Sequence, residues 1–154
     1  MKGLPLSGLQ EPWLGGSLRH LDVVGCNFYP RNEWVHDPKT RPIPPTSPLW
    51  RPLDRILAEV HARYGRPLFV AETGCEHGHR AGWLRGVAGD VRRALDAGVP
   101  VEGLCWYPIL NHPGWDDDRH LQCGLWDYAD PAGGRAAHAP LLEEWERQRA
   151  LLPA

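Results

Sequence analysis

The sequence lacks several features that would assign it to a class at once. Its 17 basic and 19 acidic residues leave a net charge of −2, and no basic stripe marks a nucleic-acid surface. No apolar run approaches the length of a membrane span, and the first eight residues lack the sustained apolar segment of a signal peptide. The four cysteines form no Cys-x-x-Cys pair, which argues against a zinc knuckle or disulfide framework. We therefore expect a cytoplasmic protein with no nucleic-acid or membrane partner.

What the sequence does contain is an unusual supply of tryptophan and of residues that interrupt secondary structure. There are eight tryptophans among 154 residues, and 16 prolines accompany 17 glycines. The length allows one domain with a real core. Aromatic residues combined with long loops suit a carbohydrate site or another small-molecule site. They also suit an ordinary loop-rich enzyme, so composition alone does not separate these readings.

Strand and helix patterns alternate along the chain. Short β-branched and aromatic runs favour strands, and apolar residues at helical spacing followed by glycine favour helices. The predicted order is strand 21–29, helix 52–64, strand 67–72, helix 81–97, strand 101–107 and helix 139–151. Long loops are expected at 30–49, which holds six prolines, at 73–80 and at 108–137. Such βα repeats predict an α/β fold with three parallel strands.

Each predicted strand finishes with a polar or aromatic side chain. Because side chains alternate along a strand, Glu72 should share a face with Leu68 and Val70, while Tyr29 and Trp106 end the other two strands. The carboxyl ends of parallel strands form the ligand-binding edge of a sheet, so these three ends are expected to converge. Cys26 and Cys105 have the opposite parity from Tyr29 and Trp106, and they should face the helices.

A carboxylate beside a tyrosine and a tryptophan suits glycoside hydrolysis. A carboxylate can attack the anomeric carbon, a tyrosine hydroxyl can orient it, and a tryptophan face can pack on a sugar ring. A retaining enzyme needs a second carboxyl group about 5–5.5 Å away to protonate the leaving group.

Four segments together resemble the C-terminal part of a clan A glycoside hydrolase, closest to the family 1 β-glucosidases. Residues 22–29 are similar to the sixth barrel strand, and residues 67–74, with a Glu-x-Gly pattern, to the seventh. Residues 103–106 resemble the eighth strand, and residues 124–128 resemble the segment after its loop. The resemblance implies the C-terminal portion of a (β/α)8 TIM barrel, in which residues 1–20 would be a remnant of a preceding βα unit and 21–154 a partial barrel.

This resemblance implies a retaining, β-glucosidase-like hydrolase of O-glycosyl bonds, with a carbohydrate substrate and neither cofactor nor metal. Glu72 would be the nucleophile and Tyr29 the residue that orients it. The residues that would contact the sugar are Asn27, Trp106, Asn111, His112 and Trp115.

Two departures from the family pattern bear on activity. Gly114 stands where an adjacent Glu-Trp pair usually grips sugar hydroxyls. The fourth-strand Asn-Glu pair that supplies the acid/base has no counterpart here, and a complete barrel needs about 250 residues. We therefore expect a catalytic segment that is incomplete by itself, a fragment or the partner of a separate N-terminal half-barrel, with negligible hydrolase activity alone. The alternatives are a non-catalytic carbohydrate-binding remnant and an unrelated small α/β domain.

Other clusters in the loops are weaker candidates. His77 and His79, near Glu76, could bind a metal, but a site needs three or four converging ligands. Residues 116–118 with His112 and His120 lack the spacing of a calcium loop, and we expect a solvated loop there. A reactive Cys75 thiol would need a neighbouring base. Glu33, Trp34 and His36, in the proline-rich loop, could touch substrate.

Overall fold

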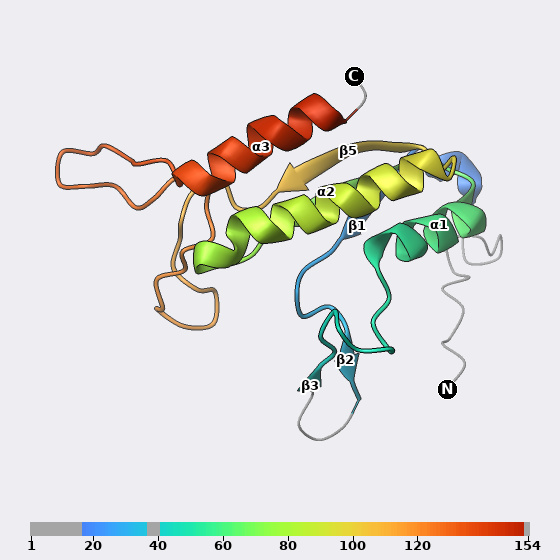
Figure 1. Cartoon of the computed structure of the whole chain (residues 1–154), viewed down its shortest axis with the longest axis horizontal. Coiled ribbons are helices and arrows are strands. Elements are labelled where there is room, and N and C mark those ends of the chain that lie inside the picture. Colours follow the sequence, from blue (N-terminus) through green and yellow to red (C-terminus); the bar gives the residue numbers. More distant parts are fainter. Residues whose placement is uncertain (1–16, 37–40, 153–154) are drawn as a thin grey trace.

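The computed structural model describes residues 17–36 and 41–152 and contains a three-stranded parallel sheet. Its strands are β1 (Val24–Asn27), β4 (Leu68–Thr73) and β5 (Val101–Trp106), in the order β1-β4-β5. The helices α1 (Leu53–Tyr64), α2 (Arg80–Asp96) and α3 (Ala139–Leu151) lie side by side as one layer, with α2 in the middle (Figure 1). The predicted α/β fold with three parallel βα units is therefore confirmed.

The core lies between the central strand and the first two helices. Leu57 of α1, Leu68 and Val70 of β4 and Val91 of α2 are all at most 2% exposed. The helix α1 ends at Gly65, whose φ of 59° is readily adopted only by a residue without a side chain. Burial of these apolar side chains therefore fixes α1 and α2 against the same face of the sheet.

The last helix is attached to α2 by polar contacts as well as by apolar ones. Leu141 is fully buried, and Glu144, which is only 2% exposed, accepts hydrogen bonds from Arg85 of α2. Arg92 of α2 donates to Gln148 of α3. The helix α3 is thus held in place by one apolar anchor and two inter-helix polar pairs.

The proline-rich loop contains structure that the sequence does not predict. The strands β2 (Trp34–Val35) and β3 (Arg41–Pro42) form a two-stranded antiparallel ladder, supported by a hydrogen bond from the Ile43 amide to the Glu33 carbonyl. Proline lacks an amide donor and is therefore disfavoured in a central strand. Pro42 is tolerated here because both strands of a two-stranded ladder are edge strands. Two short 3-10 helices, η3 (Leu18–His20) and η4 (His77–His79), complete the fold. Of the predicted preceding βα unit, residues 1–16 lie outside the described residues.

The sheet face opposite the helices is open. Gly25 and Asn27 of β1 and Glu102 and Cys105 of β5 are exposed. Within residues 17–36 and 41–152, no further strand pairs with β1 or β5 on their outer edges. None of the helices in this part of the chain is long and apolar enough to span a membrane. The three strands therefore present one covered face, one open face and a common carboxyl edge.

Candidate active site

The carboxyl ends of β1 and β4 bring together a tyrosine and a glutamate that are 43 residues apart in the sequence. The Phe28 amide donates to the Glu72 carbonyl at 2.9 Å, which extends the β1–β4 ladder past the last residue of β1. The hydroxyl of Tyr29 then donates to Oε2 of Glu72 at 2.9 Å. The pKa of Tyr29 is raised well above its usual range, mainly by burial and further by this hydrogen bond and the Glu72 charge. Tyr29 therefore stays protonated and remains a donor to the carboxylate.

A bulge in β4 decides where Glu72 points. Simple alternation predicts that Glu72 shares a face with Leu68 and Val70, and this prediction is wrong. Both neighbouring strands skip one residue of β4 after Val70, so an extra residue is inserted there. Thr73, not Glu72, then takes the buried position on the helix side. The bulge thus turns Glu72 away from the helices and toward Tyr29.

The same loss of alternation affects β5. Val101 and Leu104 both pack against the core, although they are three residues apart. Cys105 is consequently exposed, and the prediction that it faces the helices is wrong. Cys26 of β1, in contrast, packs against the core as expected.

Trp106 stands at the end of β5, opposite Thr73 of β4. Its indole N–H donates to the Cys123 carbonyl at 3.1 Å, and the side chain is half-buried. This bond ties the end of β5 to the loop between β5 and α3. The role of Trp106 as a sugar platform stays a prediction.

The loop between β5 and α3 is built around the side chain of Asn111. This residue is 5% exposed; its amide donates to Asp127 Oδ1 at 2.5 Å and its carbonyl oxygen accepts from the Gly124 amide at 2.7 Å. A Cβ on Gly124 would lie 2.4 Å from the Asn111 backbone nitrogen, so only glycine fits there. These bonds use one amide hydrogen and one carbonyl lone pair of the side chain. The contact of Asn111 with a sugar stays a prediction.

Arg80 is a buried cation that the sequence does not single out. It is 3% exposed, and it donates to the His77 carbonyl at 2.8 Å and to the Gly124 carbonyl at 2.6 Å. The backbone amide of His77 also donates to the Gln122 carbonyl. Arg80 therefore joins the loop after β4 to the loop after β5. Its position at the start of α2, next to two histidines, gives no sequence signal of this role.

These two loops and the segment that follows β1 line an open cavity of about 860 Å³ at the strand ends. Three of the predicted site residues, Tyr29, His112 and Trp115, line it, and Trp115 is 84% exposed. The other predicted residues are not among its lining: Asn27, Glu72, Trp106 and Asn111. Tyr29 is thus the residue shared by the cavity and the hydrogen bond to Glu72.

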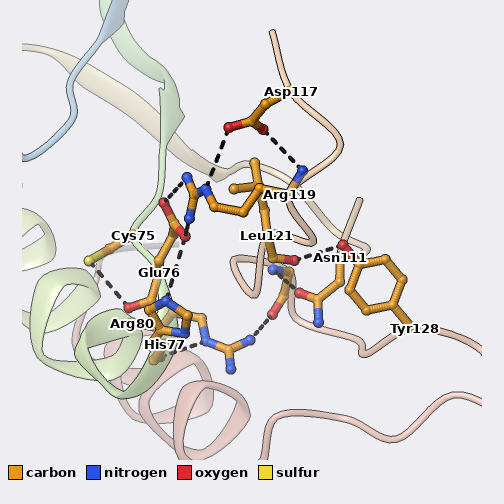
Figure 2. Close-up of polar contacts among 10 residues, drawn as sticks. Cys75, Glu76, His77, Arg80, Asn111, Asp117, Arg119, Leu121 and Tyr128 are labelled. Carbon is orange, nitrogen blue, oxygen red and sulfur yellow. Dashed lines mark hydrogen bonds and ion pairs between the residues drawn. The ribbon is translucent and has the colours of Figure 1, made fainter. Parts of the chain in front are cut away.

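Glu76 and Arg119 form the main ion pair of the cavity (Figure 2). Arg119 donates to the two carboxylate oxygens of Glu76 at 2.7 and 3.3 Å, and it also lies 3.9 Å from Asp117. The hydrogen bond from Arg119 is the main reason that the pKa of Glu76 is lowered. Glu76 is therefore an ionised carboxylate and poorly suited to donate a proton.

The other loop candidates receive little geometric support. No group of three or more His, Cys, Asp or Glu side chains in the described ranges is placed to hold a metal ion. The pKa of Cys75 is raised, mainly by burial, so its thiol is not activated as a nucleophile. The ring of His120 stacks on Tyr128 with centroids 4.9 Å apart. Trp34 is 50% exposed, away from the lining of the cavity.

The sequence matches no protein-family model and no curated protein. Solved structures do match. The family 1 β-glucosidase from Thermotoga maritima superposes with a TM-score of 0.67 at 18% identity, over 86% of this chain and 36% of that chain. The β-glycosidase from the hyperthermophile Thermosphaera aggregans gives 0.61 at 21% identity, over 84% and 32%.

The fold is similar to part of the barrel of these glycosidases. The expected resemblance to family 1 β-glucosidases is thereby confirmed at the level of fold. The chain spans about a third of the length of the glycosidases that it matches. In that partial barrel, the Tyr29–Glu72 pair occupies the carboxyl edge of the parallel strands, where barrels of this kind place their ligands.

Proposed function

We propose that this chain carries the nucleophilic half of a retaining glycoside hydrolase acting on O-glycosyl bonds. The observation that carries the proposal is the hydrogen bond of 2.9 Å from the Tyr29 hydroxyl to Glu72, at the ends of adjacent parallel strands. Glu72 would form a bond to the anomeric carbon as the bond to the leaving oxygen breaks. Tyr29 would orient the attacking carboxylate by occupying one of its oxygens, and the cavity that begins at Tyr29 would hold part of the carbohydrate.

The proposed reaction also needs a proton for the leaving oxygen. A retaining enzyme supplies it from a second carboxyl group about 5–5.5 Å from the first. Glu76 is the carboxylate that lines the cavity, but its ion pair with Arg119 keeps it ionised. We propose that the acid lies outside the described residues, on a longer polypeptide or a complementary half-barrel. The residues that remain proposed sugar contacts are Asn27, Trp106, Asn111, His112 and Trp115.

The test is covalent labelling with a 2-fluoro glycoside that carries a dinitrophenyl leaving group. This phenolate leaves without protonation, so the missing acid is not required. We expect mass spectrometry to find the glycosyl group on Glu72 in the native sequence, and no label in Glu72→Gln. The matched control is Glu76→Gln, which removes a carboxylate four residues later in the same region and should still be labelled. Label on another residue, or none, contradicts the proposal.

A second candidate function is carbohydrate binding without turnover. It is favoured by Trp115, which is 84% exposed at the cavity, and by the absence of a protonated carboxyl group among the described residues that line it. Protein that remains unlabelled by the fluoro glycoside, but whose tryptophan fluorescence responds to a β-glucoside in the native chain and not in Trp115→Ala, would support this alternative.

A further inference from the structure

Thr73 is the residue next to Glu72, and it is completely buried. The bulge in β4 places it on the helix side of the sheet, where a polar group needs hydrogen-bond partners. Its hydroxyl has two: it donates to the Phe28 carbonyl at 2.7 Å, and it accepts from the indole N–H of Trp83 at 2.8 Å. Thr73 therefore links β4, the segment after β1, and α2 through one atom.

The acceptor of the Thr73 hydroxyl is the peptide group that leads into Tyr29. The Phe28 carbonyl belongs to the bond that joins Phe28 to Tyr29, and the Phe28 amide donates to the Glu72 carbonyl at 2.9 Å. Both polar groups of Phe28 are thus held by consecutive residues of β4. Because a peptide unit is rigid, fixing its carbonyl also restricts where the Tyr29 side chain begins.

Trp83 supports this arrangement from the helix layer. Its ring stacks on Phe28 with centroids 5.6 Å apart and an interplanar angle of 15°. Trp50 meets the same phenyl ring edge-on at 5.9 Å. The ring of Phe28 is therefore held by aromatic packing, while its backbone is held by Thr73 and Glu72. Loss of the Thr73 hydroxyl would remove the partner of the buried Phe28 carbonyl and of the half-buried Trp83 N–H.

We propose that Thr73 and Trp83 are positioning residues that set the Tyr29–Glu72 hydrogen bond. Neither residue lines the cavity, and both act through the peptide of Phe28. The chemical meaning of this role rests on the proposed function of Glu72. The geometric role is independent of turnover, because it concerns a hydrogen bond within the protein.

The test uses the full chain with 13Cζ-labelled tyrosine, whose shift reports hydrogen bonding of the phenol. Tyr29→Phe assigns the Tyr29 signal among the four tyrosines, and Glu72→Leu shows its position without the acceptor. We expect Thr73→Val, which keeps the shape but removes the hydroxyl, to move the signal toward the Glu72→Leu position. Trp83→Phe, which removes the indole N–H and part of the ring that stacks on Phe28, should move it in the same direction. Thr73→Ser, which retains the hydroxyl, should restore the native position.

A purely structural role predicts a different pattern. Val91→Ala, a core change in α2 at a residue that is 2% exposed, should lower stability without moving the Tyr29 signal. If Thr73→Val lowers the urea midpoint but leaves the signal at its native position, or if Val91→Ala moves it equally, the proposal is overturned. If Thr73→Val does not fold, Trp83→Phe decides: a Tyr29 signal that stays at its native position in this variant overturns the proposal. Fluoro-glycoside labelling is scored separately, so unlabelled Glu72 with a responsive Tyr29 signal would contradict the proposed function and leave the positioning role standing.

Discussion

The two faces of the sheet differ in what covers them and in what they carry. On the helix face, Leu68 and Val70 are fully buried beneath α1 and α2. On the other face, Asn27, Glu102 and Cys105 are exposed. Tyr29 and Glu72 meet just after the bulge in β4, which reverses the face to which the following side chains point. The comparison indicates that stability comes from the covered face, while the chemistry depends on how the strand ends leave it.

The largest expected effect comes from opening a hole in the covered face. Leu57→Ala removes a fully buried side chain of α1, and we expect a loss of roughly 2–5 kcal/mol in the free energy of unfolding, from the transfer of the lost atoms and the cavity that remains. Leu49→Ala, at a residue that is 64% exposed, should change it by less than about 0.5 kcal/mol. Urea denaturation measures both. Equal losses in the two variants would break the contrast between covered and open surface.

A smaller change in stability should follow from lowering the pH, through Glu144 in the helix layer. The pKa of Glu144 is lowered, mainly by its hydrogen bonds from Arg85, so the folded state binds this proton less readily than the unfolded chain. The resulting stabilisation is present above the ordinary carboxyl pKa of about 4.3, and it is lost as the pH falls through the lower folded value. Glu144→Gln should therefore lose less stability than the native chain between neutral pH and about pH 3.

The matched control for this prediction lies on the same helix. Glu146 is 54% exposed and pairs with Arg149, so Glu146→Gln should respond to acid as the native chain does. Urea midpoints at several pH values distinguish the three proteins. An acid response of Glu144→Gln that is identical to that of the native chain would show that the Arg85 pair contributes nothing to the pH dependence.

The ion pair of the cavity should matter less for stability than the pair between α2 and α3. Glu76 and Arg119 have side chains that are 35% and 56% exposed, so water and salt screen their attraction. We expect Arg119→Ala to cost about 0–1 kcal/mol, with a smaller cost at high salt. Thermal unfolding at low and high ionic strength checks this. A loss as large as that of Leu57→Ala would mean that the loops at the strand ends belong to the core.

The smallest effect on stability is expected on the open face. Cys105 is exposed, whereas Cys123 is only 7% exposed and burial raises the pKa of its thiol. An aromatic disulfide reagent should therefore modify Cys105 first, in a fast phase of thiol modification. Cys105→Ser should remove this fast phase and leave the urea midpoint of unfolding unchanged. A longer polypeptide or partner that covers the open face would slow the fast phase. Persistence of this phase in Cys105→Ser would show that another thiol is the accessible one.

The positions of the elements could be read from the sequence to a large extent. Buried strands and amphipathic helices leave periodic patterns, and all three strands and all three long helices appear where those patterns place them. The β2–β3 ladder escaped detection because two-residue strands carry no period and Pro42 argues against pairing. The tyrosine and glutamate of the candidate site stood out because polar groups at the ends of apolar strands are conspicuous.

The orientation of side chains at the strand ends could not be predicted from the sequence. Alternation put Glu72 on the same face as Val70, whereas the bulge gives that place to Thr73. A bulge depends on how neighbouring strands pair, and Tyr29 and Glu72 are 43 positions apart, so no local pattern in the sequence predicts it. The sequence likewise carries no sign that the Asn111 amide holds the loop through Gly124 and Asp127.

The sequence by itself thus determined which residues could do the chemistry, because residue type and local period are local properties. Only the tertiary structure decided that Glu72 meets Tyr29, that Thr73 lies buried beneath them, and that the cavity begins at Tyr29. Those outcomes depend on strand register and on packing against α2, which involve residues far apart in the chain. The physical reason is that strand register and side-chain packing must be satisfied together across the whole fold.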